Sequence, residues 1–292
     1  MRQLSILTRY PEFAEEILFA QGAQSVSFVD AADEPVLEPA PGRTPLWHQT
    51  RTVGLFAAPA DVHAACAALR ETLPDAATAV ITDATLRDRE WVRVWMRDCK
   101  PLKFGDRLWI CPRDRPVRER GTALVRLDPG LAFGTGTHAS TALCLDWLAR
   151  ASLDGARVLD YGCGSGILAI AALKLGAARA VAVDHDPQAL IAARANAEVN
   201  GVARRLTVRS PENFRRSRFD VVLANILERP LIALAPRLAG SVRAGGHLVL
   251  AGLLARQAAS VRAAYKGRVT FGRARHEGDW VRLEAQRPAA RR

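Results

Sequence analysis

Apolar and polar positions in the first part of the chain alternate between strand-like and helix-like spacing. Alternating runs at 4–10, 24–31 and 51–59 predict strands, and the amphipathic segments at 11–22 and 60–73 predict helices. That order is typical of a small α+β domain in which helices cover one face of an antiparallel sheet. We therefore predict an α+β domain at the N-terminus.

From Leu153 onward, apolar runs and amphipathic segments follow one another as repeated strand–helix units. The runs that predict buried strands lie at 156–166, 179–186, 205–210, 220–226 and 246–253. The segments that predict helices lie at 167–176, 187–201 and 231–239, and a terminal hairpin is expected at 267–275 and 279–286. Alternating strands and helices predict a mostly parallel, doubly wound α/β sheet. Ligands bind such sheets beyond the carboxyl ends of the strands.

The stretch 86–116 separates these two patterns. Trp91 and Trp95 lie four positions apart, which places both rings on one helical face and predicts a packing stripe. The strand-like run that follows ends in proline-punctuated sequence. We therefore divide the chain into an N-terminal domain at 1–85, a linker at 86–116 and a larger domain at 117–292.

Composition restricts the class of protein. Hydrophobic residues make up 49% and charged residues 24% of the 292 positions, as in an ordinary globular chain. Apolar runs are too short for a membrane span and the N-terminus lacks a secretory pattern, so we expect a cytoplasmic protein without membrane contact. The five cysteines are scattered without a CxxC pair, which disfavours both a disulfide framework and a metal site.

Positive charge is concentrated in the second part of the chain. Residues 1–116 carry 14 Lys/Arg against 16 Asp/Glu, whereas 117–292 carries 27 against 14, which gives the whole chain a net charge of +11. Such asymmetry is typical of a surface that contacts RNA or the ribosome. Only four of the 41 basic residues are lysine, however, so an arginine-rich composition on solvated faces explains the same numbers. RNA contact stays open.

A glycine-rich turn carries the first chemical signal. Gly162, Gly164 and Gly166 form GxGxG directly after a predicted strand and directly before a predicted helix. Residues without side chains let the backbone turn sharply and let a ligand approach the helix N-terminus closely. A dinucleotide-binding GxGxxG would need glycine where the chain has Ile167, which disfavours a dehydrogenase.

Two other strand ends carry carboxylates. Asp184 ends the second strand of the larger domain, where a carboxylate can accept hydrogen bonds from both hydroxyls of a ribose. Asp186 precedes Pro187 and is expected to cap the next helix. Asp160 either faces a ligand or ties down the glycine loop.

A hydroxyl and a carboxamide complete the set of candidates. Thr141 offers its hydroxyl in the first turn of a predicted helix, after the glycine-rich loop 128–138 that either folds over a ligand or acts as a linker. Asn225 follows a buried strand, where its carbonyl oxygen can orient an amine. An asparagine there is also a common turn residue. His138 and His185 lie in the same loops without forming a metal-ligand pair.

Several longer motifs resemble one known family. They are DPGLAFGTGTH, LDYGCGSGILAIAALKLGA, VDHDPQALIAARANAEVNG, ANILERPLIALAP and GGHLVLAGLLARQ, with EPAPGRTPLW, EWVRVWM and FGDRLWICP in the first part of the chain. Over nearly its whole length the chain resembles the PrmA family of class I S-adenosylmethionine-dependent methyltransferases, which methylate ribosomal protein L11.

The resemblance implies a fold, a cofactor site and a reaction. The fold is α/β, a Rossmann-like methyltransferase domain preceded by a smaller ferredoxin-like α+β domain that recognises the substrate. Thr141, Gly162, Asp184 and Asn225 fall where the family binds S-adenosylmethionine, with Gly164 and Gly166 in the same loop and Asn225 beside the transferred methyl. The implied reaction is repeated methylation of lysine side chains and of an N-terminal amine of ribosomal protein L11.

Two departures and three alternatives accompany this interpretation. HAST stands where the family commonly has His-Pro-Thr-Thr, and Glu228-Arg229 places a charged pair near the expected substrate entrance. The chain could instead be a class I methyltransferase for RNA or another protein, a binding module on an inactive methyltransferase fold, or an oxidoreductase. We expect a monomer with a hinge between its domains, because methylation of separated amines requires several substrate poses. Asn225 is our candidate for orienting the amine.

Overall fold

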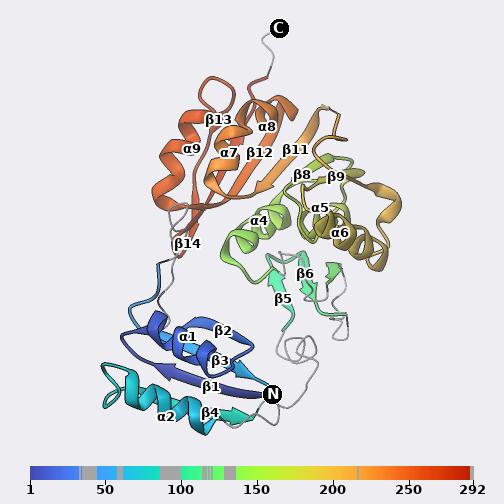
Figure 1. Cartoon of the computed structure of the whole chain (residues 1–292). Coiled ribbons are helices and arrows are strands. Elements are labelled where there is room, and N and C mark those ends of the chain that lie inside the picture. The colour runs from blue at the N-terminus through green and yellow to red at the C-terminus, as the bar shows by residue number, and fades with distance from the viewer. Residues whose placement is uncertain are drawn as a thin grey trace. The chain divides into compact units, whose positions relative to one another are not determined.

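The computed structural model describes residues 1–32, 34, 45–57, 62–85, 100–113, 117, 119, 121–127, 136–215 and 217–289. The chain divides into two compact units, Met1–Glu90 (unit 1) and Trp91–Arg292 (unit 2), which are described separately below (Figure 1). The tryptophan pair at 91 and 95, and most of the loop 128–138, lie outside the described residues. Among the described helices, none combines the length and apolar character that a membrane span requires.

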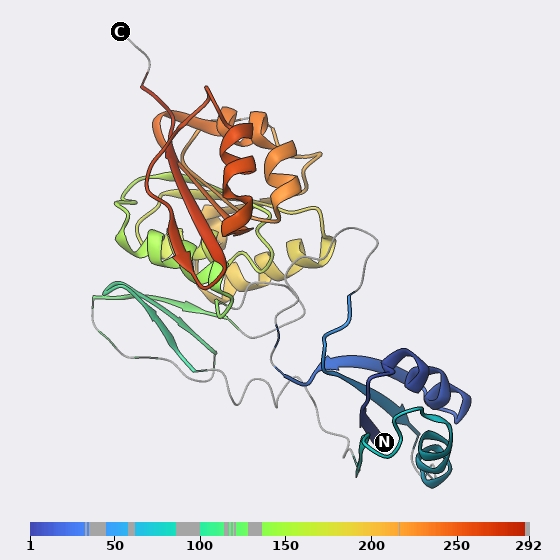
Figure 2. The ribbon, with the colours of Figure 1, turned by 90° about the vertical axis from the view of Figure 1, so that its left-hand side faces the viewer.

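In its described residues, unit 1 is a four-stranded antiparallel sheet with two helices. Its elements follow in the order β1 (Arg2–Leu7), α1 (Pro11–Ala20), β2 (Ser25–Asp30), β3 (Thr50–Phe56), α2 (His63–Thr72) and β4 (Val80–Thr85). The sheet order is β2-β3-β1-β4, which is the ferredoxin-like arrangement, so the predicted fold is confirmed. Both helices cover the same face (Figure 2). The core between the helices and the sheet includes Leu4, Leu18 and Leu69, each fully buried.

The larger sheet of unit 2 has eight strands among the described residues. They are β8 (Arg157–Tyr161), β9 (Arg179–Val183), β10 (Leu206–Arg209), β11 (Phe219–Asn225), β12 (Val242–Leu254), β13 (Thr270–Phe271), β14 (Arg275–Glu277) and β15 (Trp280–Gln286). The order is β10-β9-β8-β11-β12-β15-β13, with β14 paired to β15. Five adjacent strands run parallel, in the order β10, β9, β8, β11 and β12, and β15 is antiparallel to β12. The predicted doubly wound sheet and its terminal hairpin are therefore confirmed.

Helices cover both faces of this sheet. One face packs against α4 (Ala139–Arg150), α5 (Ile167–Lys174) and α6 (Pro187–Val199), and the other against α7 (Glu228–Ala233), α8 (Ala235–Ser241) and α9 (Ala258–Ala264). Short 3₁₀ turns follow at η1 (Ala203–Arg205) and η2 (Ala255–Gln257). Helix α6 begins where the sequence predicts, because the Asp186 side chain accepts the Gln188 N–H at 2.9 Å and a proline occupies the first turn.

A small three-stranded sheet of unit 2 comprises β5 (Leu102–Phe104), β6 (Leu108–Cys111) and β7 (Ala123–Arg126). It packs against α4 and α5, and its first two strands come from the stretch 86–116 that the sequence pattern treats as a linker. The side-chain amide of Asn200, at the end of α6, pairs with the backbone of β7 as a neighbouring strand would. Its Oδ1 accepts the Arg126 N–H and its Nδ2 donates to the Arg126 carbonyl, both at 2.8 Å.

Candidate functional site

A cavity of about 370 Å³ lies at the carboxyl ends of β8, β9 and β11. Strands β8 and β11 are neighbours although other elements separate them in sequence, and such a switch in strand order opens a crevice above the sheet. The lining residues are Thr141, Gly162, Cys163, Gly164, Ile167, Leu168, Asp184, His185, Asp186, Ala189, Asn225 and Ile226. The predicted ligand site and this cavity therefore coincide in position.

The glycine loop forms one wall of the cavity. Gly162, Gly164 and Gly166 all have positive φ angles of 50–79°, and Gly166 is the residue before the first turn of α5. A Cβ on Gly162 would lie 2.2 Å from Cγ2 of Ile226. Both a left-handed backbone and a lack of space therefore require glycine at position 162. Ile167 and Leu168, in the first turn of α5, also line the cavity, and within the described residues no side chain caps this helix end at Gly166, which suits an anionic or polar ligand group.

Asp184 supports the glycine loop and faces the cavity. Its Oδ2 accepts the Gly164 N–H at 2.8 Å and its Oδ1 accepts the Asp186 N–H at 3.0 Å, while the residue is only 8% exposed. A carboxylate offers about four acceptor positions, so each oxygen retains capacity for a ligand hydroxyl. The exposed ring of His185 lies beside it, with Nδ1 3.4 Å from Oδ1.

Thr141 and Asn225 meet across the cavity, although 84 positions separate them. Asn225 Nδ2 donates to Thr141 Oγ1 at 3.1 Å, and Thr141 is almost fully buried in the first turn of α4. The bond fixes which side of the carboxamide faces α4. A Cβ on Gly252 would lie 2.9 Å from Asn225 Oδ1 and 2.7 Å from the Ile226 carbonyl oxygen, so only glycine fits behind this pair.

Asp160 lies beneath the loop and does not line the cavity. Its Oδ2 accepts the Ala169 N–H at 3.1 Å, which anchors the first turn of α5, while Oδ1 is buried with no hydrogen-bond partner among the described residues. Burial raises the pKa of Asp160 to about 7, and the Asp184 charge adds to this while the Ala169 N–H opposes it. Of the two alternatives that the sequence left open, the structure shows the anchoring role.

The buried carboxyl of Asp160 leads to a pH-dependent prediction. An unfolded aspartate has a pKa of about 3.9, so the folded protein binds the carboxyl proton of Asp160 more tightly than the unfolded chain does. The contribution of this group to the free energy of unfolding is therefore complete below about pH 4 and is lost as the pH rises through about 7. In cofactor-free protein, Asp160→Asn should therefore gain stability relative to wild type by on the order of 2 kcal/mol between about pH 5 and about pH 8. Urea unfolding at the two pH values measures this gain, and a pH-independent difference would contradict it.

Five of the six predicted site residues line the cavity, and Gly166 caps α5 beside it. The sequence did not single out Ile226, Leu168, Ala189 or Gly252, whose roles depend on contacts between distant segments. Cys163 also lines the cavity, but burial raises the pKa of its thiol, so it is unsuited to act as a thiolate nucleophile. His138 caps α4 and packs edge-on against Trp280, with ring centroids 4.5 Å apart.

The fold and the site together define a class of enzyme. Seven described strands lie side by side in the sheet, and the last strand in sequence is antiparallel and lies between β12 and β13. A glycine loop follows the first parallel strand and an acid follows the second. These are the features of class I S-adenosylmethionine-dependent methyltransferases. The chain belongs to the family described as ribosomal protein L11 methyltransferase (PrmA), whose model matches residues 3–288.

Individual relatives agree with this assignment. A protein of Marinobacter nauticus named ribosomal protein L11 methyltransferase is 48% identical over 277 residues, covering 94% of this chain and 93% of its own. Its namesake in Methylococcus capsulatus is 48% identical over 292 residues, covering 98% and 99%. A crystal structure of a ribosomal protein L11 methylase from Lactobacillus delbrueckii subsp. bulgaricus has 29% identity and a TM-score of 0.58, covering 64% of this chain and 97% of that one.

The residues present fit S-adenosylmethionine, the cofactor of this class. The glycine loop leaves a cradle that a side chain at 162 would fill, and Asp184 keeps free acceptor capacity at the place where a ribose would bind. Within the described residues, no group of three or more His, Cys, Asp or Glu side chains could hold a metal ion.

Proposed function

We propose that this protein transfers methyl groups from S-adenosylmethionine to lysine side chains and to the N-terminal amine of ribosomal protein L11. The observation that carries the proposal is the Thr141–Asn225 hydrogen bond, which holds a carboxamide beside the glycine loop and Asp184 in a single cavity. The names of the relatives supply the substrate protein.

The cofactor would be held by backbone and carboxylate groups. Asp184 would accept hydrogen bonds from the ribose, and the glycine loop would let the ligand lie directly against the main chain. When bound, S-adenosylmethionine supplies an activated methyl group on a sulfonium. The protein therefore has to align an acceptor rather than activate the donor, and alignment alone can supply several kcal/mol of rate enhancement, about 7–11 at best.

Asn225 and its neighbours would prepare the amine. A free lysine has a pKa of about 10.4, so most of it is protonated at neutral pH and cannot attack. Apolar surroundings disfavour the charged form, and Ile226 lines the cavity, while Leu227, the next residue along the chain, is 55% exposed. The Asn225 carbonyl oxygen can then accept a hydrogen bond from the neutral amine and orient its lone pair.

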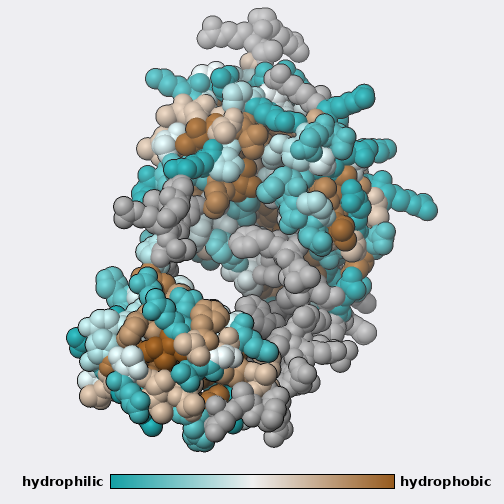
Figure 3. All heavy atoms as spheres, in the orientation of Figure 1, coloured by the Kyte–Doolittle hydropathy of each residue, from teal (hydrophilic) through white to brown (hydrophobic). Residues whose placement is uncertain are grey.

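We further propose that unit 1 recognises the substrate protein. Helix α1 and the turn before it expose three aromatic side chains, Tyr10, Phe13 and Phe19, and apolar side chains are visible on this face of unit 1 (Figure 3). Exposed aromatic residues are enriched at protein–protein contacts. As part of the same proposal, the enzyme acts as a cytoplasmic monomer.

Glu228 departs from the family pattern at the proposed substrate entrance. It is the first residue of α7, and the Ser260 hydroxyl donates to its carboxylate. The carboxylate is thereby held at the helix N-terminus, where negative charge is favourable. The negative charge of Glu228 at this place would therefore influence which substrate amines the enzyme prefers.

Replacing the carboxamide tests the proposed role of Asn225. We expect Asn225→Ala to lower kcat for methylation by about 100-fold while the KM for S-adenosylmethionine changes less than about threefold, since misplacing the acceptor affects mainly the transition state. Thr141→Val should lower kcat in the same direction, because it removes the hydroxyl that orients Asn225. Initial rates with radiolabelled methyl donor and purified ribosomal protein L11 measure both constants.

Asn213→Ala is a matched control for this series. Its side chain donates to Ser210 Oγ at 3.1 Å and does not line the cavity. The control should retain wild-type kinetics. Wild-type turnover in Asn225→Ala would refute the orienting role, whereas activity on RNA in place of the protein would redirect the substrate assignment.

A further inference from the structure

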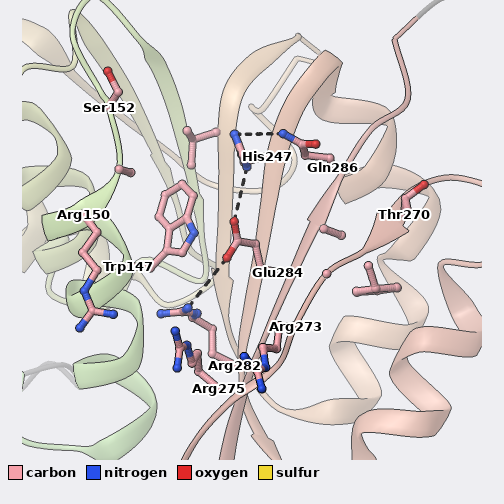
Figure 4. Close-up of a pocket in the computed structure, with 15 residues that line it drawn as sticks. Trp147, Arg150, Ser152, His247, Thr270, Arg273, Arg275, Arg282, Glu284 and Gln286 are labelled. Atoms are coloured by element: carbon pink, nitrogen blue, oxygen red, sulfur yellow. Dashed lines mark hydrogen bonds and ion pairs between the residues drawn. The ribbon is translucent and has the colours of Figure 1, made fainter.

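A second cavity, of about 730 Å³, lies in unit 2 and shares no lining residue with the cofactor site. It opens between the carboxyl end of α4 and the part of the sheet formed by β12, β15 and the edge strand β13 (Figure 4). The proposed methyl transfer does not use this space. Four of its fifteen lining residues are arginine, whereas none of the described arginines lines the cavity at the glycine loop.

Four arginines and one carboxylate line this arginine pocket, which we define by Arg150, Arg273, Arg275, Arg282 and Glu284. Arg150 is ion-paired to Asp146 at 2.7 Å, and Arg282 Nη2 lies 3.9 Å from Glu284 Oε2. Arg273 and Arg275 are exposed and make no ion pair or side-chain hydrogen bond within the part of the chain that the structure describes. The positive charges of the pocket therefore outnumber the carboxylates that pair with them.

The β14–β15 pairing places two of these charges opposite each other. Arg275 and Arg282 are register partners, and like charges directly across a ladder are destabilising. Figure 4 shows their guanidinium groups at the same end of the pocket as Arg273. An anion bound between Arg273, Arg275 and Arg282 would offset this repulsion, which explains why three arginines lie together here.

Arg282 adds a second, independent observation. It is only 4% exposed, its Nη1 donates to the Leu143 carbonyl at 2.6 Å, and its Nε is buried with no hydrogen-bond partner among the described residues. Burial lowers the pKa of Arg282 and the Arg275 charge lowers it further, whereas Glu284 opposes the shift. Arginine nevertheless stays charged in proteins, so the pocket contains a buried and incompletely paired cation.

We propose that the arginine pocket binds phosphate groups of an RNA backbone. Guanidinium forks match phosphate oxygens in geometry and charge, and the cavity is large enough for more than one phosphate. The net charge of +13 over residues 117–292 would draw a polyanion to this unit. The choice of RNA over a small free anion rests partly on the proposed function, since a ribosomal protein substrate is found next to RNA.

Binding of a fluorescently labelled single-stranded polyuridine RNA to the full-length chain tests the proposal. The test variant is Arg273→Ala/Arg275→Ala, which removes two exposed side chains and leaves the buried Arg282 in place. We expect its affinity to fall about tenfold and the slope of log K against log salt to decrease by about 1.4, because two phosphate contacts are lost. Fluorescence anisotropy at several salt concentrations measures both quantities.

Arg179→Ala/Arg204→Ala is the matched control. These exposed arginines lie on β9 and η1, toward the opposite edge of the sheet, and their replacement removes the same charge. The control should change affinity by less than about twofold. Equal losses in both variants would overturn the proposal in favour of diffuse attraction, and so would undetectable RNA binding by the wild type. Binding of inorganic pyrophosphate that depends on Arg273 and Arg275, without RNA binding, would overturn the choice of RNA.

Methylation of isolated ribosomal protein L11 by the same variants separates this proposal from the proposed function. The pocket variant should methylate the free protein at the wild-type rate, because the pocket shares no residue with the cofactor site. If no variant methylates the protein, the proposed function fails while the RNA measurement stands. If methylation is retained but the pocket variant binds RNA as wild type does, only the inference about the pocket fails.

Discussion

Asp184→Ala should abolish measurable methyl transfer and weaken binding of S-adenosylhomocysteine by at least about 100-fold. The carboxylate accepts N–H groups from Gly164 and Asp186 at 2.8 and 3.0 Å and faces the cavity with its remaining acceptor capacity. Charge-assisted hydrogen bonds contribute about 1.5–3 kcal/mol each, and about 1.4 kcal/mol corresponds to a tenfold change in affinity. The loss of two ribose contacts and of the loop support accounts for the expected effect.

Asp184→Asn separates the two contributions in this experiment. The amide oxygen can still accept one backbone N–H, but the charge and one acceptor are lost, so an intermediate loss of about tenfold is expected. Titration calorimetry with S-adenosylhomocysteine measures the affinities, and Asp186→Ala, which removes the cap of α6 at the same cavity but keeps its backbone N–H on Asp184, serves as the control for loss of local structure. The control should reduce stability by about 1 kcal/mol with a smaller effect on binding. Wild-type affinity in Asp184→Ala would place the ribose elsewhere.

Gly162→Ala is expected to have the second-largest effect. The residue has φ +79°, and its new Cβ would meet Ile226 Cγ2 at 2.2 Å. The left-handed backbone costs about 1–2 kcal/mol with a side chain present, and the overlap forces either the loop or Ile226 to move. Because both line the cavity, we expect a loss of about 2–4 kcal/mol in stability and at least about 100-fold in cofactor affinity.

Gly201→Ala provides the matched comparison for this substitution. Gly201 has φ +68° at the end of α6, and a Cβ there would meet nothing within 4 Å. It should show only the backbone cost of about 1–2 kcal/mol and bind the cofactor normally. Thermal unfolding and S-adenosylhomocysteine binding of both variants separate the contact with Ile226 from the backbone strain. Normal binding by Gly162→Ala would show that the close approach is unnecessary.

The sequence predicts the site well where local pattern determines position. An apolar run, a glycine turn and a helix in succession place Gly162 at the end of β8, and the acid ending the next strand lies beside it because neighbouring parallel strands end at one edge. The cap by Asp186 is predicted for the same reason, since it depends only on residues close in sequence.

What the sequence does not predict depends on contacts between distant segments. Gly252 is required by the backbone of Ile226, which directly follows the neighbouring strand β11, and nothing near Gly252 in sequence indicates this. The strand-like pattern of β5 and β6 is visible in the sequence, but their place in unit 2 depends on contacts with β7 and α4, which are distant in sequence. The sequence leaves the role of Asp160 open because the burial of its carboxyl decides between ligand binding and anchoring of α5. The arginine pocket is likewise not predicted, because it combines side chains from α4 with others from β14 and β15.

The most direct test of the central claim is the intact mass of purified ribosomal protein L11 after incubation with this protein and S-adenosylmethionine. We predict successive mass increases of about 14 Da per methyl group, absent with Asp184→Ala, and peptide mapping that places them on lysine side chains and the N-terminal amine. An unchanged mass, under conditions in which S-adenosylmethionine binding is measurable, would contradict the proposed substrate while leaving the cofactor site in place.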